Sequence, residues 1–281
     1  IQRCGRKINL RPRAIFNYIS RIMHLSFLLK FTISLPRLDV TLVTAGLALL
    51  VSAQAEHSNS ETEVRPENFV VIDQHIPGIK IQLRYSTASN FTGNVVTGYE
   101  KGNCWITKEA ATALSKVQKE VQQMNLSLLV FDAFRPQRAV DSFVEWAKES
   151  GTSKQEKDQY FPNLKKSELF PKGYIADKSG HTRGSTIDLT LCEVNEKGEL
   201  SPLDMGTPFD FFGEEAGTEF KGIPAQQRAN RLLLKMLMEK HGFRNYPVEW
   251  WHFTLKNEPY PDAYFDFPIS DNDTPNEING F

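Results

Sequence analysis

Two segments of the chain carry the pattern from which the rest can be understood: Ser179-Gly-His-Thr-Arg-Gly-Ser-Thr-Ile-Asp-Leu-Thr-Leu191 and Glu249-Trp-Trp-His-Phe-Thr-Leu255. They supply the imidazoles of His181 and His252 and the carboxylate of Asp188, and Glu249 adds a further carboxylate nearby. Two imidazoles and one carboxylate are the ligand count of a catalytic zinc site, where water takes the fourth tetrahedral position. A structural zinc site would be closed by four ligands, usually rich in cysteine.

The first segment predicts a strand that follows a turn. From Thr186 to Leu191 apolar and polar residues alternate, which is the period of a half-buried strand. Asp188 therefore belongs to its less apolar face. Glycines flank His181 on both sides and give the backbone freedom, so we expect His181 on a turn that folds back towards the strand.

The second segment also favours a strand, which would start after Pro247, because it is rich in aromatic residues. In a regular strand Glu249 and His252 would face opposite ways, since their separation is odd. If both serve one site, Glu249 must lie on the loop that enters the strand, or a bulge must turn its side chain. We predict the loop.

Each of these residues has an ordinary alternative when taken alone. A histidine near glycines is commonly a surface or turn residue, since histidine has many roles. The aspartate could be a strand-edge carboxylate, and the aromatic segment could be one edge of the core. Arg135, which precedes Pro136, would ordinarily be a surface charge. The combination therefore carries more weight than any one member.

Four further motifs accompany the two segments: Phe131-Asp-Ala-Phe-Arg-Pro-Gln-Arg-Ala139, Tyr85-Ser-Thr-Ala-Ser-Asn-Phe-Thr-Gly93, Gly173-Tyr-Ile-Ala176 and Glu258-Pro-Tyr-Pro-Asp-Ala-Tyr-Phe-Asp-Phe-Pro268. With them the chain, from about Phe69 to Pro268, resembles the zinc D-alanyl-D-alanine dipeptidases. The departures are peripheral, in the leader, the acidic tail and the cysteines at 104 and 192.

The resemblance implies a role for each site residue and one Zn²⁺ per chain. It makes His181, Asp188 and His252 the zinc ligands. It makes Glu249 the catalytic base and Arg135 the partner of the transition-state oxyanion, and Ser179 and Tyr85 match positions that line the substrate pocket. The implied substrate is the free dipeptide D-Ala-D-Ala, a small molecule, in cell-wall peptide turnover.

Two rival functions stay open at this point. One is a D,D-carboxypeptidase or endopeptidase that acts on peptidoglycan peptides, which an open groove would favour over a closed pocket. The other is a non-catalytic zinc protein that binds cell-wall peptide, against which the presence of both Glu249 and Arg135 argues.

The remaining periodicity predicts an α+β fold in a single compact domain. Helical spacing covers 107–124, with Thr107 as the cap, then 138–146 and 224–241, and a buried strand covers 126–131. Short apolar alternations at 70–72 and 79–83 suggest a hairpin or two edge strands. Residues 148–172 suggest a surface excursion, and 193–222 a long stretch of turns. We expect a central, mostly antiparallel sheet with helices packed on one face and the zinc site on the other.

The N-terminal 55 residues differ in kind from the rest. Basic residues precede a short apolar run, Val40 to Val51, that ends in Ser52-Ala-Gln-Ala55, as in a secretory signal peptide. We therefore expect export to the periplasm, cleavage near Ala55 and no stable membrane insertion afterwards; an uncleaved anchor is the alternative. Met23 is a plausible start. We expect a linker at 56–67, the dipeptidase domain at 68–268 and a disordered acidic tail at 269–281.

Charge and cysteine content bound the partners and the compartment. The formal net charge of −1 gives no basic field, so we expect no nucleic-acid partner. Beyond the leader two cysteines remain, Cys104 and Cys192. In an oxidising compartment they could form a disulfide or stay as two free thiols, and the sequence leaves both alternatives open.

Overall fold

The computed structural model describes residues 64–100 and 102–270. The predicted leader, most of the predicted linker and the tail from residue 271 lie outside this part of the chain. Within it, no helix has both the length and the apolar character needed to cross a membrane.

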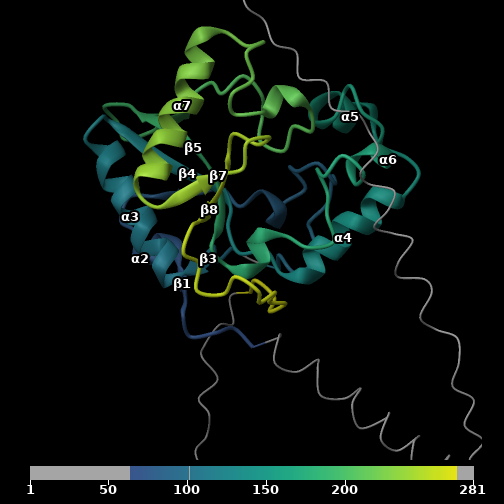
Figure 1. The fold of residues 1–281 in the computed structure, drawn as a ribbon, viewed down its shortest axis with the longest axis horizontal. Coiled ribbons are helices and arrows are strands. Elements are labelled where there is room, and N and C mark those ends of the chain that lie inside the picture. The colour runs from purple at the N-terminus through teal and green to yellow at the C-terminus, as the bar shows by residue number, and fades with distance from the viewer. Residues whose placement is uncertain (1–63, 101, 271–281) are drawn as a thin grey trace, which may run out of the picture. The chain divides into compact units, whose positions relative to one another are not determined.

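A mixed, mostly antiparallel sheet has the strand order β2-β4-β5-β8-β7, with β6 paired to β5. Figure 1 shows its strands β4, β5, β7 and β8 at the centre of the described domain. Only β2 and β4 run parallel; the other pairs are antiparallel. These strands are β2 (Lys80–Ile81), β4 (Leu126–Asp132), β5 (Thr186–Val194), β6 (Leu200–Pro202), β7 (Phe243–Asn245) and β8 (His252–Leu255). The predicted α+β architecture is confirmed.

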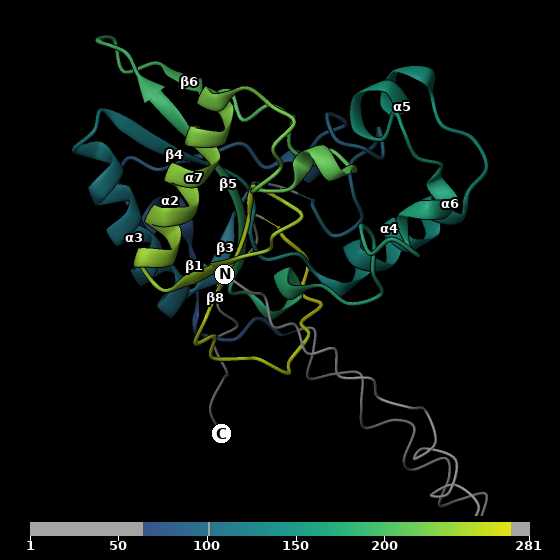
Figure 2. The ribbon, with the colours of Figure 1, turned by 45° about the horizontal axis from the view of Figure 1, so that its top comes forward.

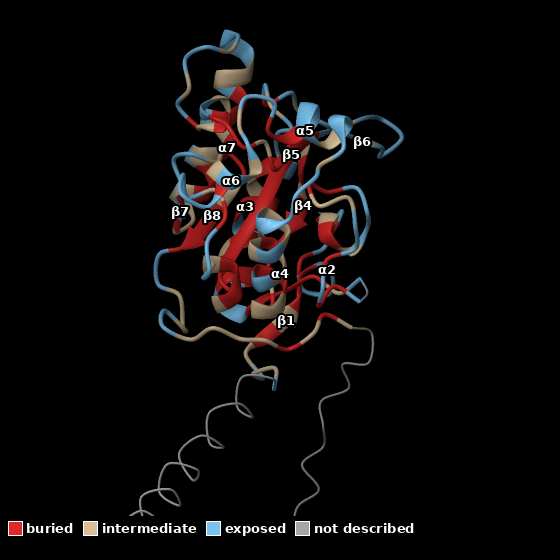
Figure 3. Ribbon diagram, turned by 90° about the vertical axis from the view of Figure 1, so that its right-hand side faces the viewer, coloured by how far each residue is buried: buried red, intermediate tan, exposed pale blue. Residues whose placement is uncertain are grey.

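Strand β5 lies in the interior of this sheet and is buried from Thr186 to Cys192 (Figure 3). Its neighbours are β4 along most of its length, β8 at its start and β6 at its end. The predicted alternation is present: Ile187, Leu189 and Leu191 are fully buried on one face, and Asp188 and Thr190 share the other. The polar face is therefore covered as well, which a half-buried strand would not require.

The two long helices, α3 (Lys108–Gln122) and α7 (Ala225–Lys240), lie on one side of the central strands, as predicted (Figure 2). On the other side lie helices α4 (Gln137–Lys148), α5 (Lys154–Tyr160) and α6 (Lys166–Leu169). Thr107 is the N-cap residue of α3, but its hydroxyl does not cap the helix; it bonds to the Ser185 hydroxyl at 2.7 Å.

The two short N-terminal strands do not form a hairpin with each other. β1 (Phe69–Val71) pairs with β3 (Trp105–Thr107) in a separate two-stranded sheet, and β2 pairs with β4 at the edge of the main sheet. Of the two predicted alternatives, edge strands are therefore correct. A single helical turn, α2 (Ile72–His75), and the 3-10 turn η1 (Arg84–Ser86) complete this region.

Two regions expected to be irregular contain short regular elements. The predicted surface excursion at 148–172 holds α5 and α6, and Tyr160, Phe161 and Leu169 anchor it in the core. The predicted stretch of turns at 193–222 contains β6, which folds back on β5, and the 3-10 turn η3 (Glu214–Ala216). Phe209 and Phe212 of this stretch are buried and anchor it in the core.

Packing contacts reach both ends of the described region. The Arg65 guanidinium lies 3.9 Å from the centre of the Trp105 ring, and Ile269 is fully buried in a β-bridge with Tyr99. Cys104 and Cys192 are both buried and both free, which is the second of the two alternatives considered for them.

Candidate metal centre and active site

His181 lies on the 3-10 turn η2 (Gly180–Arg183), directly before β5, as the glycine pattern predicts. The Ser179 hydroxyl caps this turn and accepts a hydrogen bond from the His181 backbone N–H at 3.2 Å. Gly184 ends the turn with a φ of 79°, and a Cβ there would come within 2.2 Å of the Phe69 ring. Only glycine therefore suits this corner without movement of the core.

The orientation of the His181 ring is set by its backbone partner. Nδ1 lies 2.7 Å from the Ala133 carbonyl oxygen, and because a carbonyl only accepts, Nδ1 must carry the proton. Burial lowers the pKa of His181, which favours the neutral ring. Nε2 is then left with its lone pair, the form in which histidine binds a metal.

Asp188 and His252 face each other across β5 and β8. They are paired in the register of the two strands, so their side chains project from the same face of the sheet. His252 Nδ1 lies 3.2 Å from Asp188 Oδ1 and 3.3 Å from His181 Nε2, and His181 Nε2 lies 3.2 Å from Asp188 Oδ2. Ligand atoms of all three residues lie within 4.8 Å of one another.

This cluster fits a metal ion. Asp188 Oδ1 is buried, yet it has no hydrogen-bond partner, although the His252 ring is close by. A buried carboxylate oxygen without a partner is costly unless a cation satisfies it. Nitrogen and carboxylate donors in this number suit zinc. The prediction that the three side chains converge is confirmed.

Glu249 lies on the loop that enters β8, which confirms the predicted position. The strand starts at His252, later than expected, and Glu249 stands in the turn before it. Its Oε2 lies 3.4 Å from His252 Nδ1, at the edge of the ligand cluster. Burial, opposed by His252, raises the pKa of Glu249 to about 7. The carboxylate is thus suited to accept and release a proton near neutral pH.

Arg135 follows β4 and reaches the same pocket, held by a residue that the sequence reasoning missed. Asp132 accepts bonds from Arg135 Nε at 2.9 Å and from the Tyr99 hydroxyl at 2.7 Å, and it lies 3.6 Å from His181 Nδ1. The guanidinium lies 5.0 Å from the centre of the Tyr85 ring. Asp132 stands in one of the motifs quoted above, three residues before Arg135, and that spacing was the available signal.

Asp210 is the second residue that the sequence reasoning missed. It is buried, lies in the left-handed region with a φ of 63°, and accepts a hydrogen bond from the Tyr85 hydroxyl at 2.9 Å. Its other oxygen, Oδ2, is buried without a partner. Burial raises the pKa of Asp210 well above its usual range. It stands in a region without periodicity, so no pattern in the sequence pointed to it.

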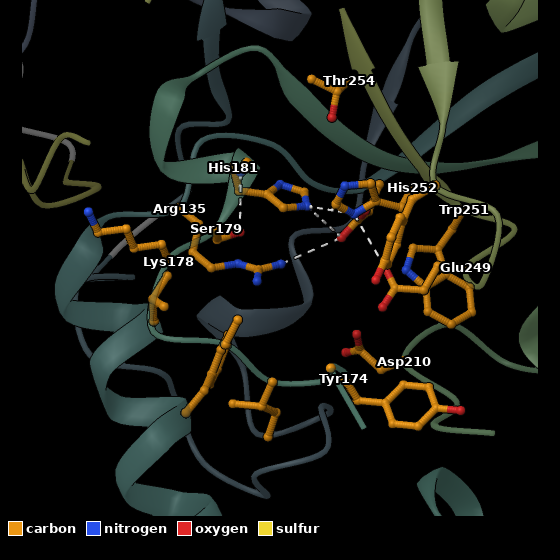
Figure 4. A pocket seen from close by; sticks show the side chains of 18 of the residues that line it. Arg135, Tyr174, Lys178, Ser179, His181, Asp210, Glu249, Trp251, His252 and Thr254 are labelled. Carbon is orange, nitrogen blue, oxygen red and sulfur yellow. Dashed lines mark hydrogen bonds and ion pairs between the residues drawn. The ribbon is translucent and has the colours of Figure 1, made fainter. Parts of the chain in front are cut away.

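Apart from Asp132, which lies behind Arg135 and His181, these side chains line one cavity of about 300 Å³. Figure 4 shows Asp210 and Glu249 on one side of it and Arg135 and Ser179 on the other, with His181 and His252 above. The predicted pocket residues Tyr85 and Ser179 both contribute to its lining. All seven predicted site residues are therefore gathered in one place. Lys178 and Tyr174 also line the cavity, from the segment that leads into η2.

The chain is similar to one group of peptidases over most of its length. A sequence profile described as D-Ala-D-Ala dipeptidase, peptidase family M15, matches residues 65–270. The D-alanyl-D-alanine dipeptidases of Enterococcus faecium and Enterococcus faecalis are 41% and 42% identical, each over 72% of this chain and 98% of the relative. That of Streptomyces coelicolor is 39% identical with the same coverage. A solved vancomycin-resistance D,D-pentapeptidase in complex with Zn(II) has 14% identity and a TM-score of 0.30, over 56% of this chain and 76% of that one.

Proposed function

The chain belongs to the D-Ala-D-Ala dipeptidase family of M15 peptidases, and we propose that it hydrolyses the free dipeptide D-Ala-D-Ala to two D-alanines with the help of zinc. One observation carries this proposal: a single cavity joins a three-ligand cluster, a buried glutamate beside it and a buried arginine. The same constellation argues against a protein that merely binds zinc, since neither Glu249 nor Arg135 would be needed there.

His181, Asp188 and His252 would hold the zinc ion, whose chemistry is to act as a Lewis acid and to lower the pKa of water towards about 7. Asp132 and the Ala133 carbonyl oxygen both contact Nδ1 of the His181 ring, whereas Nε2 faces His252. Such partners fix the orientation of a ligand and its tautomer.

Glu249 acts as the proton carrier of the reaction. Its ionised carboxylate takes a proton from the attacking water, and the same carboxyl then gives that proton to the nitrogen of the departing D-alanine. Its place at the edge of the ligand cluster, 3.4 Å from His252, supports this role. Burial raises the pKa of Glu249, which favours a carboxyl that can both take up and release a proton.

Arg135 stabilises the negative charge that develops on the carbonyl oxygen as water adds to it. Its side chain is only 12% exposed, so the charge acts in a medium of low polarity, where such stabilisation is strong. Asp132 fixes the guanidinium through Nε, and the rings of Tyr85 and Phe143 pack against it. The group is therefore in position before the substrate arrives.

The two ends of a free dipeptide carry opposite charges, and the cavity offers a partner for each. Asp210, with its unpartnered Oδ2, suits the ammonium group, and the Ser179 hydroxyl suits the carboxylate. Because the cavity has a partner for each charged end of the dipeptide, it favours a free dipeptide over a longer peptide chain. The small volume supports the same choice.

Purified enzyme tested on D-Ala-D-Ala, an acylated D-Ala-D-Ala peptide and L-Ala-L-Ala decides between the candidates. We expect turnover of the first alone. Release of D-alanine from the acylated peptide would point to a D,D-carboxypeptidase or endopeptidase. No turnover of any of the three by zinc-loaded protein would refute a peptidase of this specificity.

We further propose that the protein is exported and loses its first 55 residues. The basic region, the short apolar run and the Ser52-Ala-Gln-Ala55 site support this. An exported enzyme would recover D-alanine from dipeptide released in cell-wall turnover. N-terminal sequencing of exported protein should start at Glu56; a start at Ile1 or Met23 would contradict the proposal.

A further inference from the structure

A second cavity lies beside the catalytic one and shares no lining residue with it. We call it the Arg84 cavity; it has a volume of about 400 Å³, and its lining includes Arg84, Phe131, Thr190, Thr207, Phe209 and Trp250. Three of these are direct chain neighbours of catalytic-cavity residues: Arg84 precedes Tyr85, Phe209 precedes Asp210 and Trp250 precedes Trp251. The two cavities thus lie on opposite sides of the same backbone segments.

Arg84 is a positive charge in this cavity without a counter-ion in the described part of the chain. It is partly buried, its Nε is enclosed without a hydrogen-bond partner, and its guanidinium lies 5.3 Å from the centre of the Phe131 ring. An arginine with this much burial normally pairs with a carboxylate or a carbonyl oxygen. Arg135 and Arg231 do so in this structure, through Asp132 and through backbone carbonyls respectively.

Thr190 adds a second unsatisfied donor to the same cavity. It is 1% exposed, and its hydroxyl has no hydrogen-bond partner. Asp204 is the one acidic residue of the lining, and its oxygens are already engaged by the Gly206 N–H at 2.8 Å and the Gln227 amide at 2.6 Å. Arg84 Nε–H and the Thr190 hydroxyl are therefore two groups of this cavity that can still donate a hydrogen bond.

Apart from Gln82 and Thr207, the rest of the lining is apolar or glycine. Phe131 and Phe209 stack at 4.8 Å between ring centres, and Met205 and Trp250 are almost fully buried. A cavity that joins two free donors to an aromatic and aliphatic wall suits a ligand with one anionic group and a small apolar part. Planar carboxylates match a guanidinium in geometry as well as in charge.

We propose that the Arg84 cavity is a second binding site, specific for a small carboxylate ligand held by Arg84 and Thr190 against Phe131. This goes beyond the dipeptidase reaction and does not require it. Such a ligand could come from two sources, which differ at the nitrogen atom. Free D-alanine carries an ammonium group there, whereas the C-terminal residue of a longer peptide carries an amide. N-acetyl-D-alanine stands for the second source.

Each cavity is lined by one of two neighbouring tryptophans, whose rings pack against each other at 5.2 Å between centres. Trp250 lines the Arg84 cavity, where its indole N–H donates to the Thr207 hydroxyl at 2.9 Å, and Trp251 lines the catalytic cavity. Their indole N–H signals can be followed by NMR in the zinc-loaded enzyme while D-alanine or N-acetyl-D-alanine is added. Trp250→Phe and Trp251→Phe assign the signals.

We expect a saturable shift of the Trp250 signal with at least one probe, and binding weaker by roughly tenfold or more in Arg84→Gln. Thr190→Val should weaken binding too. Arg244→Gln, which removes an exposed arginine on β7, is the matched control and should bind as the wild type does. The inactive variant Glu249→Gln should also bind normally, so failure here is distinct from failure of the dipeptidase proposal.

The proposal is overturned if neither probe shifts the Trp250 signal, if only the Trp251 signal moves, or if Arg84→Gln binds the probes as tightly as the wild type. Binding of D-alanine alone would identify the free amino acid as the ligand. Binding of N-acetyl-D-alanine alone would identify a peptide terminus.

Discussion

The two faces of β5 are equally buried, but one carries apolar side chains and the other carries polar ones. On one face Ile187, Leu189 and Leu191 are fully buried and apolar, and α7 packs against this strand. On the other face Asp188 and Thr190 are 2% and 1% exposed, and both keep an oxygen without a hydrogen-bond partner. Burial of apolar groups stabilises a fold, whereas burial of an unsatisfied polar group destabilises it. The first face therefore supports the second, which holds buried polar atoms that no other protein group satisfies in the described part of the chain.

The largest expected effect is in the catalytic cavity that the polar face of β5 lines, at Glu249, which lies beside His252. Glu249→Gln keeps the shape but cannot take a proton, so kcat with D-Ala-D-Ala should fall by roughly 10²–10⁴-fold. Zinc content, measured by metal analysis, should remain at one ion per chain because Glu249 is not a proposed ligand. Glu193→Gln, an exposed glutamate at the far end of β5, is the matched control and should keep full activity. Undiminished turnover in Glu249→Gln would remove this mechanism.

The apolar face should respond in stability and not in chemistry. Leu189→Ala removes a fully buried side chain from the centre of the sheet, and the free energy of unfolding in urea should fall by about 2–5 kcal/mol. The kcat of the folded fraction should stay near the wild-type value. Leu232→Ala on α7, where the side chain is 43% exposed, should change stability by less than about 0.5 kcal/mol. A large loss of kcat in folded Leu189→Ala would mean that the two faces are not separate in function.

Asp210 is a second buried carboxyl of the catalytic cavity, so it should also combine a cost in stability with a role in binding. Because burial raises its folded-state pKa above the unfolded value, the unfolded state releases this proton first, and Asp210 lowers stability as pH rises above the unfolded pKa. Asp210→Asn should therefore raise the unfolding temperature at pH 7. It should also raise the KM for D-Ala-D-Ala by roughly tenfold or more, through loss of the partner for the ammonium group.

Tyr85→Phe is the matched control for Asp210→Asn, because it removes only the hydroxyl that donates to Asp210. It should leave the carboxyl in place and raise KM less. In the wild type KM should fall as pH rises through the pKa of Asp210, since only the ionised form pairs with the ammonium. A KM that is unchanged in Asp210→Asn would show that the ammonium binds elsewhere.

The sequence predicted the parts of the site that local patterns encode. Alternation placed Asp188 on a strand, glycines placed His181 on a turn, and the odd separation from His252 placed Glu249 on a loop; all three are confirmed. The structure adds the register of β5 and β8, which brings Asp188 opposite His252 and which no local pattern specifies.

The features that the sequence did not predict depend mainly on contacts between distant segments. Asp132 belongs to the site because the turn before β5 brings His181 next to it. Asp210 belongs to the site because its loop lies against Tyr85, whose hydroxyl donates to it. The local pattern predicts Thr107 as a helix cap, but its hydroxyl bonds to the Ser185 hydroxyl, which only the tertiary packing brings within reach. β6 was missed because a three-residue strand has too short a pattern to be told from a turn.

The smallest effect separates two threonines on the polar face of β5. The Thr190 hydroxyl is buried without a partner, so Thr190→Val should raise the free energy of unfolding by about 1 kcal/mol. Thr186 lies on the same face and is fully buried, but its hydroxyl is paired with that of Thr254 at 2.9 Å. Thr186→Val should therefore lower stability by about 1 kcal/mol, since it leaves the Thr254 hydroxyl without its partner. Equal effects of the two substitutions in urea denaturation would show that Thr190 is satisfied in solution. Burial of the Thr190 hydroxyl would then cost no free energy of folding.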